Sequence, residues 1–378
     1  MPSTPWWRAR RDALLALAAD RSPRYVYDLA TVRQRARDLR AAVPADRVHY
    51  AVKANDHPEI LRAVVDEGLD LECVSVYEIE HVLDAVPGFP PERVLYTPNF
   101  AGRDEVARAL ALGVHATVDN AATLDAWAEV WAGREVSVRV DPGVGKGHHD
   151  HVKTAGDASK FGVSPSDLPA LAEAARRHSV RVVGLHAHTG SGYDDLGVWA
   201  ENARLLGRLA REHFPEARHV NVGGGIPVPT GDAPPYDLAA AGAALGEART
   251  AFPDLAVWIE PGRFLVAEAG VLLARVTQVK RKGAVRYVGL DAGMNSLLRP
   301  ALYGAHHDVV NLTRLDATPA GPAEIVGPIC ESSDVLARAR PFPETDEGDV
   351  VLIDTAGAYG FVMASHYNRR PPAEEVAL

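Results

Sequence analysis

The segment VHYAVKANDHPEILRAVVDEGLDLECV, residues 48–74, decides the fold. It begins with a β-rich run, Val48–Val52, passes through a helical pattern, Pro58–Glu67, and ends in a second β-rich run, Leu71–Val74. A strand, a helix and a second strand in this order predict a βαβ unit with parallel strands.

The same alternation continues along the chain as far as Ile259. Six further strands are predicted at Val94–Tyr96, Ala116–Val118, Val136–Val140, Val182–His186, His219–Val222 and Val257–Ile259. Helical patterns between them are Val76–Asp84, Arg103–Leu112, Ala121–Trp131, Asp167–His178 and Gly197–His213. Strands alternating with helices in this number favour an α/β barrel of the (β/α)8 TIM type, in which functional groups lie just beyond the C-terminal ends of the strands.

The pattern changes after Arg263, where β-rich runs follow one another without long helices between them. The predicted strands are Val271–Lys280, Ala284–Leu290, Val309–Leu315, Ala323–Val326 and Asp349–Ile353, and Tyr25–Asp28 is assigned to the same sheet. We therefore expect three segments: an N-terminal helix and strand over 1–28 that associate with a β domain, a barrel over 29–263, and the C-terminal all-β domain over 264–378.

Charge and cysteine content exclude several classes of protein. The chain has 378 residues with 40 Lys and Arg against 50 Asp and Glu, a formal net charge of −10. An acidic chain of this kind is a poor nucleic-acid binder. Cys73 and Cys330 are its only cysteines, which argues against a disulfide framework and fits a reducing, cytoplasmic compartment.

The N-terminus resembles a signal peptide only superficially. Basic residues at Arg8–Arg11 precede an apolar run, Ala13–Ala19, but that run is short and is bracketed by Asp12 and Asp20. We expect an amphipathic helix here. No stretch approaches the ~20 apolar residues of a membrane-spanning helix, so we expect no membrane association.

Lys53 lies at the end of the first predicted barrel strand, where a reactive amine would be useful. A lysine amine forms Schiff bases with carbonyl compounds, and pyridoxal 5′-phosphate acts as an electron sink for carbanions. Taken alone, Lys53 is more readily explained as an exposed surface lysine.

His186-Ala187-His188-Thr189-Gly190-Ser191 follows another predicted strand and offers an imidazole beside a small anion-binding turn. One imidazole could stack on a pyridine ring. A metal site would need a third ligand, which His148–His151 could supply, but that cluster lacks a recognised metal-ligand spacing. We therefore predict no metal.

Two further segments suit a phosphorylated pyridine cofactor. Gly223-Gly224-Gly225 is either a plain turn or a close approach of backbone amides to a phosphate. Glu260 and Arg263 flank Pro261-Gly262 after the last barrel strand. The carboxylate could keep a pyridine nitrogen protonated and the guanidinium could bind a phosphate or carboxylate; the alternative is a surface ion pair.

Cys330 precedes Glu331 in the β domain, so a thiol and an acid adjoin. A thiol can donate a proton if its surroundings tune it. The alternative role of Cys330 is that of a small buried hydrophobe.

Seven segments together resemble the fold-type III pyridoxal-phosphate-dependent decarboxylases of basic amino acids, and within them the diaminopimelate decarboxylase branch. They are Tyr50–Asn55, His186–Gly192, Gly223–Gly225, Glu260–Arg263, Asp291–Tyr303, Gly327–Asp334 and Ala356–Pro371. The resemblance covers about Tyr25 to Val376. Departures include Tyr77 where such relatives usually have glycine, Thr189 in place of an aliphatic residue, and an end at Leu378 where relatives continue with a strand and a helix.

The resemblance implies roles for individual residues. Lys53 would hold pyridoxal 5′-phosphate as a Schiff base, His188 would stack on its ring, and Glu260 would pair with its pyridine nitrogen. Residues around the phosphate would be Ser191, Gly223, Gly224, Gly225, Gly262, Arg263 and Tyr359.

It also implies a reaction, the decarboxylation of meso-2,6-diaminopimelate to L-lysine and carbon dioxide as the last step of lysine biosynthesis. Cys330 would protonate the product carbon, in a homodimer whose subunits share their active sites. Residues that would bind the substrate are Arg263, Arg299, Tyr303, Glu331 and Tyr359, with Glu331 facing the distal amine.

Three alternatives remain at this point. A related decarboxylase could act on carboxynorspermidine, ornithine or a specialised metabolite. An alanine-racemase-like enzyme would share the barrel but would usually have arginine in place of Glu260. A non-catalytic pyridoxal-phosphate carrier would lack the β domain and the Cys330-Glu331 segment.

Overall fold

The computed structural model describes residues 4–143, 159–192, 195, 197–231 and 233–378. The chain forms two compact units. One comprises Arg33–Pro227 and Pro235–Phe264, and the other comprises Met1–Val32, Val228–Pro234 and Leu265–Leu378.

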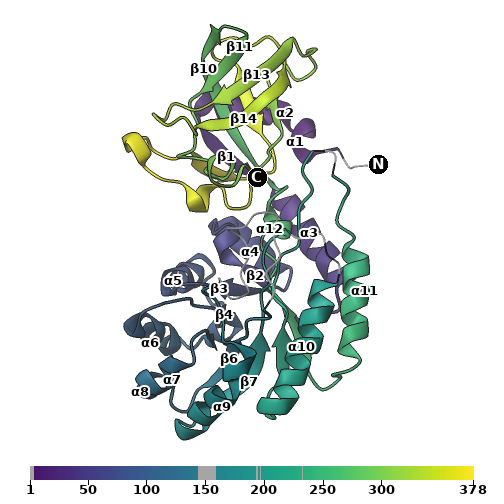
Figure 1. The fold of residues 1–378 in the computed structure, drawn as a ribbon. Coiled ribbons are helices and arrows are strands. Elements are labelled where there is room, and N and C mark those ends of the chain that lie inside the picture. Colours follow the sequence, from purple (N-terminus) through teal and green to yellow (C-terminus); the bar gives the residue numbers. More distant parts are fainter. Residues whose placement is uncertain (1–3, 144–158, 193–194, 196, 232) are drawn as a thin grey trace. The chain divides into compact units, whose positions relative to one another are not determined.

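The first unit is a closed parallel barrel of eight strands, coloured in Figure 1 from purple-blue at β2 through teal to green, so the predicted barrel is confirmed. Adjacent strands pair in sequence order, and β2 pairs with β9 to close the ring. The strands are β2 (Arg47–Ala51), β3 (Asp70–Cys73), β4 (Val94–Tyr96), β5 (His115–Val118), β6 (Glu135–Arg139), β7 (Arg181–His186), β8 (His219–Asn221) and β9 (Ala256–Ile259).

Helices alternate with these strands along the chain. They are α3 (Leu29–Ala42), α4 (Pro58–Asp66), α5 (Val76–Ala85), α6 (Arg103–Ala111), α7 (Ala122–Ala126), α8 (Ala128–Trp131), α9 (Leu168–Arg177), α10 (Val198–His213), α11 (Leu238–Arg249) and α12 (Arg263–Val266). The single helix predicted over Ala121–Trp131 is wrong, because Trp127 leaves the helical region with φ −128° and ψ 43° and divides it into α7 and α8.

Local sequence explains the helix starts. In α5, the Ser75 hydroxyl accepts a hydrogen bond from the Glu78 N–H at 3.2 Å, and the Glu78 carboxylate accepts one from the Val74 N–H at 2.7 Å. This reciprocal arrangement is a variant of the capping box. In α4, Pro58 occupies the first helical turn, where its missing N–H costs nothing.

The N-terminal half of the barrel interior holds a layer of imidazoles. Ser137 Oγ lies 2.9 Å from both His115 Nε2 and His219 Nε2, and the His219 ring stacks on Trp258 at 3.6 Å. His49 lies against the same indole, with ring centroids 5.0 Å apart. Burial lowers the pKa of His49 and His115 to about 4 and that of His219 to about 2, so these rings are neutral near pH 7.

The second unit is built on a mainly antiparallel sheet, which confirms the predicted β domain. Its strand order is β12–β15–β10–β11–β13–β14, and β1 pairs with β10 and with β16. The strands are β1 (Arg24–Tyr27), β10 (Gly270–Lys282), β11 (Val285–Leu290), β12 (Val309–Asn311), β13 (Gly321–Val326), β14 (Val335–Phe342), β15 (Val350–Ile353) and β16 (Glu374–Ala377). The strand predicted over Val309–Leu315 is too long, since the chain turns after Asn311.

Two N-terminal helices, α1 (Trp6–Ala9) and α2 (Arg11–Asp20), pack on this sheet. Trp7, Leu14 and Ala18 are buried in one cluster with side chains of β1, β10 and β15. The short amphipathic helix predicted from the N-terminal sequence is therefore part of the core of this unit. The remaining helix, α13 (Arg299–Tyr303), follows β11.

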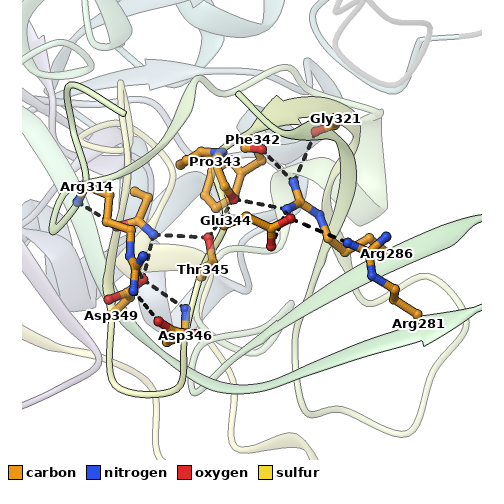
Figure 2. Close-up of polar contacts among 11 residues, drawn as sticks. Arg281, Arg286, Arg314, Gly321, Phe342, Pro343, Glu344, Thr345, Asp346 and Asp349 are labelled. Carbon is orange, nitrogen blue, oxygen red and sulfur yellow. Dashed lines mark hydrogen bonds and ion pairs between the residues drawn. The ribbon is translucent and has the colours of Figure 1, made fainter. Parts of the chain in front are cut away.

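A buried arginine fastens the loop between β14 and β15, as Figure 2 shows. Arg286 is 3% exposed, and its guanidinium donates to the carbonyl oxygens of Gly321, Phe342 and Pro343 at 2.6–3.1 Å. The Phe342 and Pro343 carbonyl oxygens also accept from the Ala320 N–H and the Thr345 hydroxyl, both at 3.0 Å, so Arg286 adds a second donor to each of them. Farther along the loop, the Asp349 carboxylate accepts a hydrogen bond at 2.8 Å from Arg314, which follows β12.

Candidate active site

Lys53 lies in a 3₁₀ turn, Val52–Ala54, immediately after β2. Its Nζ is 2.9 and 2.7 Å from the two carboxylate oxygens of Glu72, a fully buried residue of the neighbouring strand β3. The Thr97 hydroxyl, just after β4, donates to the same carboxylate. Lys53 is therefore not a plain surface lysine, because a buried acid fixes its ammonium group at the mouth of the barrel.

Glu72 and Thr97 were not predicted as site residues. The signal was present, since Glu72 alternates with Leu71 and Cys73 within a predicted strand. Alternation places such a residue on the opposite face from its apolar neighbours. In a closed barrel that face is the interior.

His188 follows β7 and carries a neutral imidazole. Its Nδ1 accepts a hydrogen bond from the Gly224 N–H at 3.2 Å, so any ring proton resides on Nε2. Burial, and then the nearby cations Arg139 and Lys53, lower the pKa of His188 to about 3. A neutral aromatic ring held in this way is suited to stacking on another ring.

Glu260 follows β9 and is buried among polar partners. Its Oε1 accepts from Asn221 Nδ2 at 2.7 Å, and its Oε2 lies 3.4 Å from His186 Nε2. Burial alone would raise the pKa of Glu260, but the His186 imidazole and the Lys53 ammonium hold it below its usual range. The carboxylate is thus ionised and can accept a hydrogen bond from a protonated ring nitrogen.

Gly223 and Gly224 allow the ends of β7, β8 and β9 to approach closely. A Cβ on Gly223 would lie 2.7 Å from His188 Nδ1, and one on Gly224 would lie 2.0 Å from the Glu260 carbonyl oxygen. The Gly223 N–H donates to Asn221 at 3.0 Å. The N–H groups of Gly223 and Gly224 are therefore used within the protein, and close packing explains why these positions are glycine.

Arg263 begins α12, and one of its guanidinium nitrogens donates to Ser191 Oγ at 3.3 Å. Gly262, just before it, packs against the turn that carries Lys53, since a Cβ there would lie 3.0 Å from Ala54 Cβ. The structure thus brings a guanidinium and a hydroxyl together at the rim on which Lys53 lies.

Two other groups of predicted residues lie in the β unit. Arg299 is buried in α13, with its guanidinium carbon 6.0 Å from the centroid of the Tyr303 ring. Cys330 is exposed, which rules out the alternative of a small buried hydrophobe, whereas Cys73 is buried. Tyr359 has a left-handed backbone, with φ 56°.

The segment that follows β15 supplies contacts that the sequence analysis missed. Asn368 bonds to Cys330, and the Tyr367 hydroxyl donates to the Glu331 carboxylate. A third missed residue is Arg139 of β6, whose buried guanidinium lies 3.9 Å from Asp119.

The described residues contain no group of three or more His, Cys, Asp and Glu side chains arranged to hold a metal ion. His148–His151, considered above as a possible source of ligands, lie outside the described residues. None of the helices in the described part of the chain has both the length and the apolarity needed to cross a membrane.

The residues at the rim of the barrel fit a phosphorylated pyridine aldehyde. They comprise an amine for its carbonyl group, an ionised acid for its ring nitrogen, a neutral ring for stacking, and a guanidinium–hydroxyl pair for its phosphate. These are Lys53, Glu260, His188, Arg263 and Ser191.

Comparison with known proteins agrees with this chemistry. Residues 29–267 match the family described as "Pyridoxal-dependent decarboxylase, pyridoxal binding domain". The chain is 37% identical over 375 residues to a diaminopimelate decarboxylase of Methanothermobacter thermautotrophicus, covering 94% of this chain and 86% of that protein. It is 38% identical to one of Pseudomonas aeruginosa, covering 94% and 88%.

Among solved structures, the fold resembles diaminopimelate decarboxylase from Helicobacter pylori complexed with L-lysine. The TM-score is 0.88 at 30% identity, covering 95% of this chain and 92% of that one. The cofactor implied by these similarities is pyridoxal 5′-phosphate. The chain belongs to the pyridoxal-dependent decarboxylases, within the diaminopimelate decarboxylase family.

Proposed function

We propose that this enzyme removes carbon dioxide from meso-2,6-diaminopimelate to give L-lysine, the last step of lysine biosynthesis. The observation that carries the proposal is that curated relatives 37–38% identical over 94% of the chain are diaminopimelate decarboxylases. The arrangement of Lys53, Glu72, His188 and Glu260 supports it.

When bound, the cofactor supplies an electron sink for the bond pair that the departing carboxylate leaves behind. Lys53 would hold the cofactor covalently through its carbonyl carbon. Glu72, at 2.7 Å from Nζ, keeps the amine at the mouth of the barrel and can take or return its proton. Thr97 fixes the orientation of Glu72 by donating to it.

His188 and Glu260 would contact the ring. The neutral imidazole of His188 can lie flat against one ring face without adding charge. The ionised Glu260 would bind the ring nitrogen and favour its protonated form, which is the stronger electron sink. Asn221 holds one oxygen of Glu260 at 2.7 Å, so the acid is positioned before the cofactor arrives.

The phosphate would be bound by Arg263 and Ser191 at the same rim, with the backbone around Gly225 and Gly262 and with Tyr359. Gly223 and Gly224 contribute because, without side chains, they let the ends of the strands pack closely beside the phosphate position. A guanidinium and a hydroxyl are well suited to phosphate oxygens because both donate hydrogen bonds to them.

The far end of the substrate would distinguish it from ornithine or arginine, since diaminopimelate carries a second amino-acid head. Arg299 and Tyr303, helped by Arg263 and Tyr359, would bind the distal carboxylate. Glu331 would bind the distal ammonium. Cys330 would deliver a proton to the carbon that has lost its carboxylate.

The proposed active form is a homodimer in the cytoplasm. In it, Cys330 and Glu331 of each subunit would complete the site of the other. We also retain the functional division into 1–28, 29–263 and 264–378, with the first and last segments forming one β domain.

The test uses purified enzyme loaded with pyridoxal 5′-phosphate and supplied separately with meso-diaminopimelate and L-ornithine. From meso-diaminopimelate we expect L-lysine and carbon dioxide in equal amounts. A Lys53→Ala variant should form no product and should lose the Schiff-base absorbance at ~420 nm. Carbon dioxide release from ornithine with no lysine from diaminopimelate would overturn the assignment of substrate.

A second variant tests recognition of the distal head. Arg299→Lys keeps the positive charge but removes the planar fork that can grip a carboxylate with two bonds. We expect KM for diaminopimelate to rise about tenfold or more, since a charge-assisted hydrogen bond is lost. An unchanged KM would show that Arg299 does not bind this substrate.

A further inference from the structure

Cys330 and Glu331 lie in a turn between β13 and β14 that is fastened at its base. Asp334, 3% exposed, accepts hydrogen bonds from the N–H groups of Ile329 and Met294, both at 2.6 Å. The backbone up to Ile329 is therefore fixed. Cys330 and Glu331 themselves are exposed and depend on other contacts for their orientation.

Those contacts come from a second turn, 38 residues farther along the chain. The Cys330 N–H donates to Asn368 Oδ1 at 3.1 Å, and Asn368 Nδ2 donates to Cys330 Sγ at 3.2 Å. A backbone N–H can only donate, so the carboxamide oxygen must face it and the amide nitrogen must face the sulfur. One side chain thus holds both the backbone and the thiol of Cys330.

The neighbouring residue holds Glu331 in the same way. The Tyr367 hydroxyl donates to Glu331 Oε1, and this bond is the main reason that the pKa of Tyr367 rises to about 12. Tyr367 therefore remains a hydrogen-bond donor at neutral pH. It occupies one oxygen of the Glu331 carboxylate and leaves the other for a ligand.

The backbone of this second turn is strained. Asn368 and Arg369 both lie in the left-handed region, with φ 54° and 56°. Two adjacent non-glycine residues there are costly, although asparagine tolerates the conformation better than most residues. Exposed hydrogen bonds contribute little to stability, so support of the fold is a poor explanation for the arrangement.

We infer that Tyr367 and Asn368 are positioning residues: Asn368 aims the Cys330 thiol, and Tyr367 orients the Glu331 carboxylate for the substrate's distal ammonium. The inference rests on the proposed function for the roles of Cys330 and Glu331. The geometry of the four residues stands independently of it, and so does the first measurement below.

The first measurement is the alkylation of Cys330 by iodoacetamide in the holoenzyme, followed by mass spectrometry across pH 6–9. The assay is specific because Cys73, the other cysteine, is buried. Asn368→Asp keeps the acceptor for the Cys330 N–H and tolerates the left-handed backbone, but it loses the donor to Sγ and adds a negative charge beside it. We expect alkylation near neutral pH to slow about tenfold and its pH profile to move to higher pH, since the thiolate is the reacting form.

Two further variants complete the alkylation test. Asn368→Gly removes both bonds while retaining the left-handed φ, in case the aspartate variant folds poorly. His366→Ala is the matched control, because it lies in the same turn and its side chain makes no capping hydrogen bond. We expect the glycine variant to lose the wild-type profile and the control to keep it.

The second measurement separates binding from turnover with diaminopimelate. Tyr367→Phe should raise KM about tenfold with a smaller change in kcat, because it frees the carboxylate that binds the distal amine. Asn368→Asp should lower kcat with a smaller change in KM. A role confined to fold stability would instead reduce the thermal midpoint and leave both parameters of the folded enzyme unchanged.

The outcomes are distinguishable from failure of the proposed function. If wild-type enzyme forms no lysine but the alkylation profile shifts in Asn368→Asp, the positioning of Cys330 stands and the substrate is wrong. Wild-type alkylation profiles in both Asn368 variants, measured on protein with a normal thermal midpoint, would overturn the inference for Cys330. An unchanged KM in Tyr367→Phe, from an enzyme that does form lysine, would overturn it for Glu331.

Discussion

We expect the imidazole layer at the N-terminal end of the barrel to make the protein less stable in mild acid. His219 has a folded pKa of about 2, against 6.5 for an unperturbed histidine. Because the folded value lies below the unfolded one, protonation favours the unfolded state. The stabilisation is complete above pH ~6.5 and is lost as the pH falls toward the folded pKa.

The size of the effect follows from these values. Between pH 7.5 and 5.5 a group with a pKa of 6.5 when unfolded and of 4 or lower when folded contributes a loss of about 1.4 kcal/mol. His49, His115 and His219 all meet this condition. Together they should lower the free energy of unfolding by about 4 kcal/mol over that range. The charged groups nearest the layer are Asp70, Glu135, Glu260, Arg47 and Arg218, and their effects are smaller than that of burial.

The perturbation is His219→Gln, which keeps an amide able to reach Ser137 but cannot take up a proton. Urea unfolding at pH 7.5 and 5.5, followed by tryptophan fluorescence, gives the pH-dependent change in stability. We expect the variant to be less stable at pH 7.5, because it loses the stacking on Trp258, yet to lose about 1.4 kcal/mol less than the wild type on acidification. The exposed histidine variant His366→Ala should behave as wild type. An acid-dependent loss as large in His219→Gln as in the wild type would refute the reasoning.

Three other predictions follow from individual contacts. Glu72→Gln removes the carboxylate charge that fixes the Lys53 amine. We expect steady-state kinetics to show kcat falling about 100-fold, and absorption spectra to show the cofactor absorbance retained. An unchanged kcat would show that Glu72 only fills space. Gly184→Ala would place a Cβ 1.9 Å from His219 Nε2. Urea unfolding should show that the free energy of unfolding falls by about 1–3 kcal/mol or more, as for other overpacked cores. An unaltered midpoint would mean that the imidazole rings can shift to accommodate the methyl group at little cost. Arg286→Met removes three hydrogen bonds that a buried guanidinium donates to carbonyl groups of the β unit (Figure 2). We expect urea unfolding to show a loss of about 3 kcal/mol, whereas Arg281→Met, on an exposed arginine nearby, should cost little.

Much of the barrel could be predicted because each βαβ unit has a local signature. The period of the apolar residues changes from helix to strand, and the strand ends mark the rim at which Lys53, His188 and Glu260 lie. Strands β14 and β16 were missed for the opposite reason. β14 carries alternating arginines with Pro341 near its end, and β16 is short and acidic, so neither shows the apolar run by which a strand is recognised.

The contacts of the site were harder to predict than its strand ends. The hydrogen bonds between Asn368 and Cys330 depend on a turn in which Asn368 and Arg369 have left-handed backbone angles. Glycine is the usual sequence signal for such angles, and neither residue is glycine, so the sequence did not predict this turn. Gly223-Gly224-Gly225 was predicted to be either a plain turn or a close approach of backbone amides to a phosphate. The N–H groups of Gly223 and Gly224 bond to Asn221 and His188, a pairing that depends on how three strands meet.

Alternation along the barrel strands explains why the imidazole layer and the cofactor residues occur together. Along β8 and just beyond its end, His219, Asn221 and Gly223 follow one another at every second position, so they share one face and rise through the barrel in that order. β9 repeats the arrangement with Trp258 below Glu260. A polar interior is unusual for a barrel of this kind, which is commonly filled with branched aliphatic residues.

The imidazole layer and the site residues at the C-terminal strand ends need different surroundings on the same strands. The site residues at the C-terminal strand ends include Glu260, whose pKa is held below its usual range by charged and hydrogen-bonding partners close by. A second layer of charges directly below would compete for those partners and change the charge on Glu260. Neutral imidazoles avoid this, because they fill volume and bond to Ser137 without carrying charge near pH 7. The acid sensitivity predicted for His219 is therefore a consequence of how the barrel separates the charged residues of the site from its core.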